Sequence, residues 1–203
     1  MPRPDSILSR TDMPPPAPIC RPGPGFRVEG HAIVSADGMI ADAAGAMPAA
    51  LRNDADWRAF QAALDAAAVV VLGRLGHQRH PNPGRRRLVL TGTVAGLAPD
   101  PAQQLALLWN PAGAPLAAAL TALGVDGGTI AVTGGTRVFG LFLPCYDSFV
   151  LSECHGFVLP GGTPCFAAGH PRSVLAASGL GPGASVAIDA AAGVTTTLWR
   201  RRG

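Results

Sequence analysis

The 203-residue sequence has few charged residues and no long run of one sign. Charged side chains make up 14% of the chain, and the formal net charge is only +3. Two short arginine triplets, at 85–87 and 200–202, are far apart, and the C-terminal one is typical of a solvated tail. This mild, scattered charge fits an anionic small molecule, and we expect no nucleic-acid partner.

Metal-binding and membrane-spanning patterns are also missing. The four cysteines, Cys20, Cys145, Cys154 and Cys165, form no C-x-x-C motif, and no histidine pair completes a zinc pattern. We therefore expect free thiols in a reduced compartment and no metal site. No segment approaches the roughly 20 apolar residues of a membrane span. Prolines between residues 14 and 18 interrupt any N-terminal apolar run of signal-peptide length. These absences predict a cytoplasmic protein without membrane contact.

The composition supports one folded domain. Apolar residues make up 48% of the chain, which is enough for a substantial core at this length. Residues 1–25 are rich in proline and lack periodic hydrophobicity, so we interpret them as a flexible arm. Residues 26–203 then form the domain.

Within that domain, apolar runs of strand length alternate with helical patterns. Strands are expected at 30–35, 69–72, 88–91, 130–133 and 147–152, and those at 69–72 and 88–91 are interpreted as fully apolar. Helices are expected from 54 to about 67, at 115–123 and at 136–143, and a closing hairpin at 186–189 and 194–199. Runs that are apolar on both faces indicate a mostly parallel sheet covered by helices. In the first helix, Trp57, Phe60, Leu64 and Ala67 share one face at helical spacing.

A paired glycine separates the strand at 130–133 from the next helix, in the segment Thr133-Gly134-Gly135-Thr136-Arg137-Val138-Phe139. Two glycines let the backbone approach a ligand closely, and a helix start offers unpaired N–H groups to a phosphate. The segment is also compatible with a tight turn that binds nothing, because glycine pairs are common in turns. The dinucleotide fingerprint G-x-G-x-x-G is absent.

Two further strand ends carry polar residues. Gly73-Arg74 follows the strand at 69–72, and Thr91-Gly92 ends the strand at 88–91. Ligands collect at the carboxyl ends of parallel strands, and an arginine there can bind a phosphate through two hydrogen bonds. Arg74 alone fits an ordinary surface arginine equally well. Together, the three strand ends favour one site for a polyanion.

Acidic residues open the first helix at Asp54 and Asp56. Acids in a first turn often only complement the helix dipole, and this is our interpretation of Asp54. Asp56 lies four residues before Phe60, which puts its carboxyl group and the ring on one side of the helix. A carboxyl group at the edge of an apolar pocket has a raised pKa and can deliver a proton.

Taken in order, these segments resemble the dihydrofolate reductase superfamily from about residue 28 to residue 202. The segments that carry the resemblance are 35–40, 46–48, Asp56 with Phe60, 71–74, 84–91, 132–139, 146–152 and 161–166. The resemblance implies a three-layer α/β/α fold whose mostly parallel mixed sheet ends in a C-terminal antiparallel hairpin. It also implies an NADPH-dependent reductase acting on a small molecule, with a mobile loop around residues 38–50.

The resemblance assigns roles to single residues. Asp56 matches the substrate-facing acid, and Ser152 matches the hydroxyl residue that hydrogen-bonds it. Further substrate contacts are expected from Asp37, Met47, Phe60 and Arg85. The residues expected to hold the cofactor are Ala32, Ile33 and Ile40 near the nicotinamide, Gly73, Arg74 and Thr91 toward the adenosine 2′-phosphate, and Thr133, Gly134, Gly135, Thr136, Arg137, Val138 and Phe139 around the pyrophosphate.

The chain departs from dihydrofolate reductases at three positions. Ala49 replaces a tryptophan after Met-Pro, and Leu75 and Gly76 replace a basic residue and a threonine that help hold phosphates. His77 is a possible substitute, although a lone surface histidine is more often without a ligand. These departures favour the riboflavin-pathway reductase branch, which implies a possible homodimer. True dihydrofolate reductase and a non-catalytic nucleotide-binding descendant stay open. The segment Trp109–Gly113 is interpreted as packing of the indole with an asparagine-capped turn.

Overall fold

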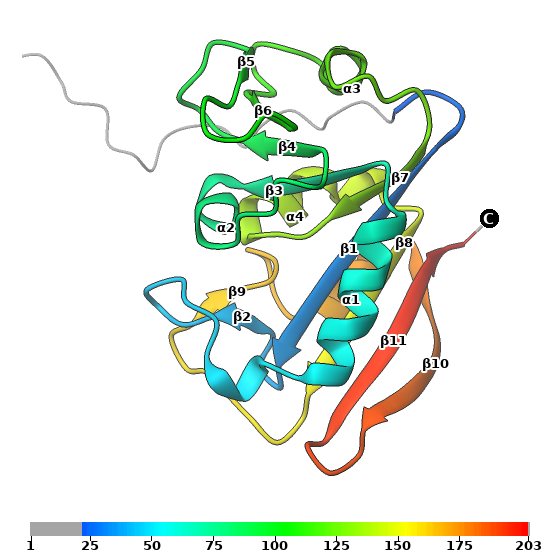
Figure 1. The fold of residues 1–203 in the computed structure, drawn as a ribbon. Coiled ribbons are helices and arrows are strands. Elements are labelled where there is room, and N and C mark those ends of the chain that lie inside the picture. The colour runs from blue at the N-terminus through cyan, green and yellow to red at the C-terminus, as the bar shows by residue number, and fades with distance from the viewer. Residues whose placement is uncertain (1–21, 203) are drawn as a thin grey trace, which may run out of the picture.

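The computed structural model describes residues 22–202. Most of the segment interpreted as a flexible arm therefore lies outside the described residues, and residues 22–25 lead directly into the first strand. Nine strands form one sheet in the order β10-β11-β8-β1-β7-β3-β4-β6-β5 (Figure 1). Their bounds are β1 Phe26–Ser35, β3 Val69–Gly73, β4 Arg87–Leu90, β5 Leu97–Pro99, β6 Ala106–Trp109, β7 Gly128–Val132, β8 Ser148–Cys154, β10 Leu180–Asp189 and β11 Val194–Arg201.

The six central strands run parallel, from β8 through β1, β7, β3 and β4 to β6. Their β-branched runs are buried because both faces of the sheet are covered; Val69 and Val71 point to one face and Val70 and Leu72 to the other, all four below 9% exposed. The edges are antiparallel. β10 and β11 form the expected C-terminal hairpin, with β11 paired to β8, and β5 pairs with β6 at the far edge.

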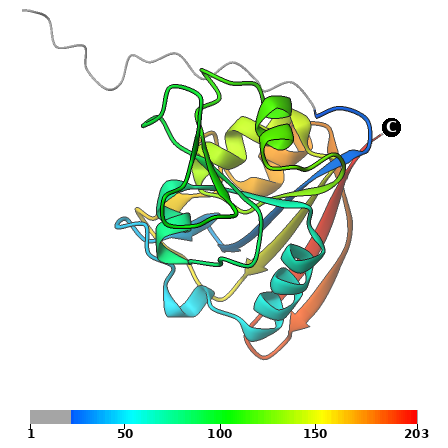
Figure 2. The same ribbon diagram turned by 45° about the horizontal axis from the view of Figure 1, so that its top comes forward.

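Helices cover the two faces unequally. Helix α1 (Asp54–Ala66) packs alone on one face, over a core cluster that includes Leu64, Val70 and Val89. Helices α3 (Leu116–Ala122), α4 (Thr136–Phe142) and α5 (Pro171–Ala177) gather on the other face, away from α1 (Figure 2). The three-layer α/β/α architecture predicted from the sequence is confirmed. No helix within residues 22–202 combines the length and the apolar character that crossing a membrane requires.

Short elements complete the fold around the carboxyl ends of the strands. Helix α2 (Arg74–Arg79) begins where β3 ends, and a small sheet pairs β2 (Met39–Ala41) with β9 (Thr163–Pro164). One-turn 3-10 helices cover Ala49–Leu51 (η1) and Leu143–Cys145 (η2). The sequence analysis gave no bounds for α2, α5, β2, β5, β6 and β9; the strands β2, β5 and β9 have only two or three residues, too few to show a period of their own.

Two local predictions had different outcomes. Of the two residues that could cap the first helix, Asn53 and Asp54, Asn53 is the cap, since its side-chain oxygen accepts hydrogen bonds from the backbone N–H groups of Ala55 and Asp56. The prediction that Trp57 belongs to the apolar face of α1 is wrong: its side chain is 52% exposed, and it contacts Phe60 only along the outer side of the helix. The later residues of the stripe are the covered ones: Leu64 is buried, and Phe60 and Ala67 pack against the same cluster.

The segment at Trp109 has the packing role that was inferred for it. Trp109 ends β6, is fully buried, and its indole N–H donates to the carbonyl oxygen of Ala114 at 2.8 Å. The side-chain oxygen of Asn110 accepts from the backbone N–H of Ala112 at 3.1 Å and so caps the turn. This segment therefore closes the β6–α3 connection.

Candidate functional site

The paired glycines form a turn that brings bare backbone to the surface. The Gly134–Gly135 peptide bond is cis, and Gly134 has φ +108°, in the left-handed region that favours glycine. A Cβ atom at Gly134 would lie 2.9 Å from the ring of Phe139, so Phe139 packs against the turn from the inside. Gly135 is exposed and caps α4. A ligand can thus approach the backbone of Gly135 without meeting a side chain from that residue.

The strand tip at Gly73 lies directly beside this turn. The backbone N–H of Gly73 donates to the carbonyl oxygen of Gly134 at 2.9 Å. A Cβ atom at Gly73 would also lie within 3.9 Å of the backbone nitrogen of Gly135. Arg74 follows as the first residue of α2 and is exposed. The segment expected around the pyrophosphate and the segment expected toward the adenosine 2′-phosphate are therefore neighbours at the carboxyl edge of the sheet.

The remaining residues of the 133–139 segment serve mainly the turn itself. Val138 and Phe139 are buried, and their backbone N–H groups donate to the carbonyl oxygen of Gly135. The hydroxyl group of Thr136 donates to the carbonyl oxygen of Pro164 in β9, while Arg137 is exposed. The side chain of Thr136 therefore anchors the small sheet, and only its backbone faces the turn.

Next to Arg74 a pocket of about 360 Å³ opens beyond α2. Its lining residues are Arg74, His77, Gln78, Thr93, Asp100, Ala102, Gln103 and Leu108. Thr91 is buried and shares a hydrogen bond with the hydroxyl group of Thr93 at 2.9 Å. Thr91 therefore supports the pocket through Thr93, on the side where the adenosine end of a dinucleotide was expected.

His77 is not the surface histidine inferred from the sequence. It is 4% exposed, and its Nε2 lies 2.6 Å from Oδ2 of Asp100. Burial opposes ionisation of Asp100, but hydrogen bonds from the Ala102 N–H and from His77 outweigh it and lower the pKa of this carboxyl group. The pair ties α2 to the β5–β6 connection, so the imidazole is already committed to a structural contact.

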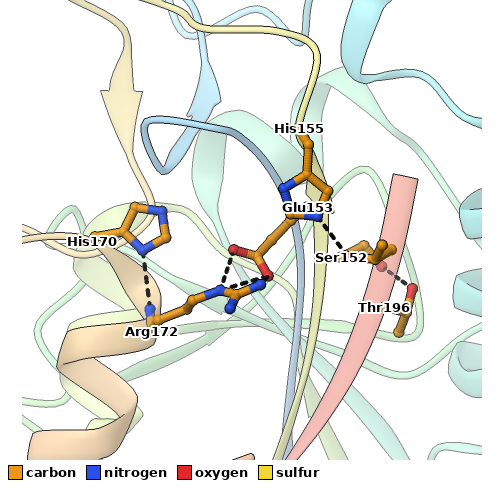
Figure 3. Close-up of polar contacts among 7 residues, drawn as sticks. Ser152, Glu153, His155, His170, Arg172 and Thr196 are labelled. Atoms are coloured by element: carbon orange, nitrogen blue, oxygen red, sulfur yellow. Dashed lines mark hydrogen bonds and ion pairs between the residues drawn. The ribbon is translucent and has the colours of Figure 1, made fainter. Parts of the chain in front are cut away.

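Asp56 and Ser152 meet on the face of the sheet that α1 covers. Asp56 is half-buried in the first turn of α1, and burial raises its pKa, while a hydrogen bond from Ser152 and the charge of His31 partly offset this. Ser152 is 1% exposed on β8, and its hydroxyl group also shares a hydrogen bond with Thr196 of β11 at 2.7 Å (Figure 3). The acid and the hydroxyl residue matched by resemblance are thus in contact.

Ile33 lies near the acid, and Ile40 lies near the glycine turn. Ile33, near the end of β1, pairs in register with Ser152 and therefore lies on the same face as Asp56. Ile40 of β2 approaches the turn, since its Cδ1 would lie 3.8 Å from a Cβ atom at Gly135. Ala32 is half-buried on the opposite face of β1. Of the residues expected near a nicotinamide, Ile33 therefore shares the face of Asp56 and Ile40 adjoins the glycine turn, whereas Ala32 faces the other side of the sheet.

Two predicted substrate contacts do not face this site. The carboxyl group of Asp37 accepts from the Ser35 hydroxyl at 2.5 Å and from the Leu159 N–H at 2.9 Å. Burial raises its pKa, but these bonds outweigh burial and leave the pKa below its usual value. Asp37 therefore fastens the turn after β1 to the segment after β8, and its oxygens are used there.

Arg85 is the second exception. Its guanidinium group binds Asp65 at 2.5 Å and Gln61 at 2.9 Å, both in the last turns of α1. Asp65 lies nine residues after Asp56, which is about 13 Å along a helix. Arg85 therefore holds the far end of α1. Met47 lies in the loop after β2, with a side chain that is 37% exposed.

Sequence reasoning missed His31, Glu29 and Thr196. Glu29, His31 and Ile33 point to the same face of β1. Glu29 was overlooked because only residues 30–35 were interpreted as a strand. The opposite face of β8 carries an ion pair between Glu153, 4% exposed, and Arg172 at the start of α5, joined at 2.6 Å (Figure 3). Within residues 22–202, no three histidine, cysteine, aspartate or glutamate side chains cluster closely enough to hold a metal ion.

A second hollow, of about 500 Å³, lies at the other end of the sheet. It is lined mainly by apolar residues around Phe26 and helix α3. Phe26 and Gly128 start their strands there, so this hollow lies at the amino edge of the parallel strands. Because ligands of such sheets bind at the carboxyl edge, the glycine turn and Asp56 mark the better candidate.

Comparisons with known proteins agree with this architecture. A riboflavin biosynthesis protein from Shewanella sp. PV-4 is 21% identical, with a TM-score of 0.61 over 87% of this chain and 99% of that chain. Dihydrofolate reductase from Enterococcus faecalis, solved with NADP(H) and RAB-propyl, is 19% identical, with a TM-score of 0.62 over 87% and 97%. The diaminohydroxyphosphoribosylaminopyrimidine deaminase/5-amino-6-(5-phosphoribosylamino)uracil reductase from Thermotoga maritima is 15% identical, with a TM-score of 0.59 over 90% of this chain and 57% of that chain.

These likenesses establish the class of fold. The chain has the dihydrofolate reductase-like fold, as predicted from the order of its sequence segments. No family model and no curated protein sequence matches the chain.

Proposed function

We propose that this chain is an NADPH-dependent reductase of the riboflavin-pathway type, acting on a C=N or C=O carbon of a heterocyclic or ribosylamino substrate. The observation that carries the proposal is the hydrogen bond between the Gly73 N–H and the Gly134 carbonyl oxygen. This contact puts the cationic strand tip beside the glycine turn, at the edge of the sheet that also leads to Asp56.

The residues present fit a dinucleotide. Gly135 is exposed, and a Cβ atom there would have only Ile40 near it, at 3.8 Å. The open space above this backbone suits a pyrophosphate, which peptide N–H groups bind well. Arg74 would pair with a phosphate, and the pocket beyond it would take the adenosine end. The cofactor supplies a hydride when it is bound.

The acid at residue 56 has the properties of a substrate-orienting or proton-relaying group. Burial raises the pKa of Asp56, which extends the pH range in which it carries a proton. Ser152, held by Thr196, keeps the carboxyl group in one orientation. A heterocycle resting on Ile33 would present its nitrogen to this acid. Closure of the loop at residues 38–50 would exclude water from the reacting atoms.

The substrate class follows from the departures in the loop and from the likenesses. Ala49 stands where dihydrofolate reductases carry a tryptophan, which speaks against a dihydropteridine. Two of the three similar structures are described as riboflavin-pathway proteins. The likeness to a dihydrofolate reductase keeps that activity as the second candidate. A cytoplasmic location and a homodimer stay predictions.

A titration of NADPH fluorescence, followed by a turnover assay, tests the proposal. We expect saturable binding and NADPH oxidation that depends on a ribosylaminopyrimidine substrate. Asp56→Asn should lower turnover at least tenfold with little change in NADPH affinity, the size expected for a proton-transferring group. Absence of NADPH binding would favour a non-catalytic descendant of the fold. Turnover of dihydrofolate, inhibited by methotrexate, would favour the second candidate.

A further inference from the structure

An arginine joins helix α2 to the loop after β2. The guanidinium group of Arg79, in the last turn of α2, donates to the carbonyl oxygen of Gly45 and to that of Ala44, the latter at 3.1 Å. Arg79 and Ala44 are exposed, so the contact lies at the surface. In Figure 1 the loop after β2 lies below α2. The arginine thus bridges two elements that are 34 and 35 residues apart in the sequence at its two contacts.

The tip of this loop, residues 42–46, is a closed turn. The backbone N–H of Gly45 donates to the carbonyl oxygen of Asp42 at 2.9 Å, and the carboxyl group of Asp42 accepts from the Ala46 N–H at 2.8 Å. Gly45 has φ +73°, in the left-handed region that favours glycine, and a Cβ atom there would lie 3.4 Å from the guanidinium group of Arg79. The turn therefore holds its own shape, and a glycine leaves room for the arginine.

Both elements that Arg79 joins also reach the glycine turn. Helix α2 begins at Arg74, directly after the strand tip that contacts this turn, and Arg79 follows five residues later, about 7.5 Å along the helix. On the other side, Ile40 of β2 approaches Gly135. Arg79 therefore closes the loop onto α2 next to the exposed backbone where the pyrophosphate is proposed.

We propose that Arg79 is a latch for the dinucleotide site. Its two hydrogen bonds hold the loop against α2, and they must break before a dinucleotide can enter or leave. Arg79 is thus a positioning residue, which acts on the cofactor through the loop. Because the same bonds oppose entry and release, the latch slows both rates and leaves the affinity nearly unchanged. The gating role rests on the proposed function, whereas the latch itself does not.

The latch is tested on the full chain without cofactor, by ¹⁵N NMR relaxation. In Arg79→Ala, the amide order parameters of Ala44 and Gly45 should fall from about 0.85 to below about 0.6. Arg79→Lys keeps the charge but loses the planar fork of donors, so intermediate values are expected. Arg86→Ala, at an exposed arginine just before β4, removes the same charge at the amino edge of the sheet and should leave both values unchanged. Unchanged values in Arg79→Ala would overturn the latch.

The gating role is tested by stopped-flow mixing with NADPH. Arg79→Ala should raise the association and dissociation rate constants by about fivefold each, the size of one exposed charge-assisted hydrogen bond, and leave the Kd within about twofold. Loss of a positive charge alone would instead slow the association of an anionic cofactor. Arg86→Ala should therefore speed neither step.

Two results would overturn the gate. Slower association with a raised Kd in Arg79→Ala would show that this arginine binds a phosphate directly, and unchanged rates would show that the loop does not control access. If the wild type does not bind NADPH, the proposed function and the gate fail together, whereas the order parameters still decide whether the latch exists.

Discussion

The two adjacent glycines of the turn should respond in opposite ways to the same substitution. At Gly134, a Cβ atom would lie 2.9 Å from the Phe139 ring, and φ is +108°. A left-handed backbone costs a non-glycine residue about 1–3 kcal/mol. Overpacking against a buried ring adds about 1–3 kcal/mol. At Gly135, φ is −80° and the nearest side-chain atom would be 3.8 Å away, so alanine fits without strain.

We therefore expect Gly134→Ala to lower the free energy of unfolding by about 2–6 kcal/mol. For a chain of this size, that lowers the melting temperature by roughly 5–20 °C. Gly135→Ala should leave the melting temperature within about 3 °C of the wild type, because Gly→Ala changes at compatible sites cost little. Its methyl group would stand where the pyrophosphate is proposed, so the Kd for NADPH should rise at least tenfold, about 1.4 kcal/mol.

Thermal unfolding followed by circular dichroism, and fluorescence titration of NADPH, measure the two effects separately. A Gly135→Ala protein that is stable and binds NADPH as tightly as the wild type would refute the placement of the pyrophosphate. A stable Gly134→Ala protein would refute the packing of Phe139 against the turn.

Three further changes test other parts of the site. Because burial raises the pKa of Asp56, the wild type loses stability as pH rises through that pKa. In melting curves across pH, Asp56→Asn should therefore be the more stable protein at pH 8 and gain nothing below about pH 4, and equal melting temperatures at pH 8 would contradict this. Arg74→Ala should weaken NADPH binding about tenfold and NADH binding less, as expected for one lost charge-assisted contact, and equal losses for both cofactors would remove Arg74 from the 2′-phosphate. Arg172→Ala leaves the buried Glu153 carboxylate without its partner and should lower the free energy of unfolding by about 1–3 kcal/mol; the double variant with Glu153→Gln should recover part of this loss in urea titrations.

The central sheet could be predicted from the sequence because its strands have a distinct hydrophobic pattern. The runs at Val69–Leu72 and Ile130–Val132 are apolar on both faces, which only a covered, parallel sheet accommodates. The turn at Gly134-Gly135 was located from the sequence because a glycine pair separates a buried strand from a helix, but the pair alone does not tell a ligand site from an ordinary turn. Its contact with Gly73 was also anticipated, because parallel strands end at one edge of their sheet.

Other features depend on tertiary contacts that no local pattern encodes. Arg85 was assigned to the substrate by position in a matched segment, but it pairs with Asp65 and Gln61, which lie 20 and 24 residues away in the sequence. Asp37 was assigned in the same way, and its carboxyl group is taken by a backbone N–H that lies 122 residues away. Trp57 has helical spacing with the core, yet its side chain is 52% exposed. A resemblance to a family predicts which sequence positions to consider for a site. The hydrogen-bond and ion-pair partners that the fold provides then determine the role of a charged side chain.

The departures at residues 75–77 change how a dinucleotide would be held. Leu75 is 56% exposed and apolar, and the His77 imidazole is committed to Asp100. On α2, Arg79 donates to the carbonyl oxygens of Ala44 and Gly45, so it holds the loop after β2. The cationic contact to a phosphate would then fall to Arg74, beside the bare backbone of Gly135. Binding of this kind depends more on the fit of the pyrophosphate against the Gly135 backbone than on charge near the adenosine end. Gly135→Ala should therefore cost more affinity for NADPH than Arg74→Ala.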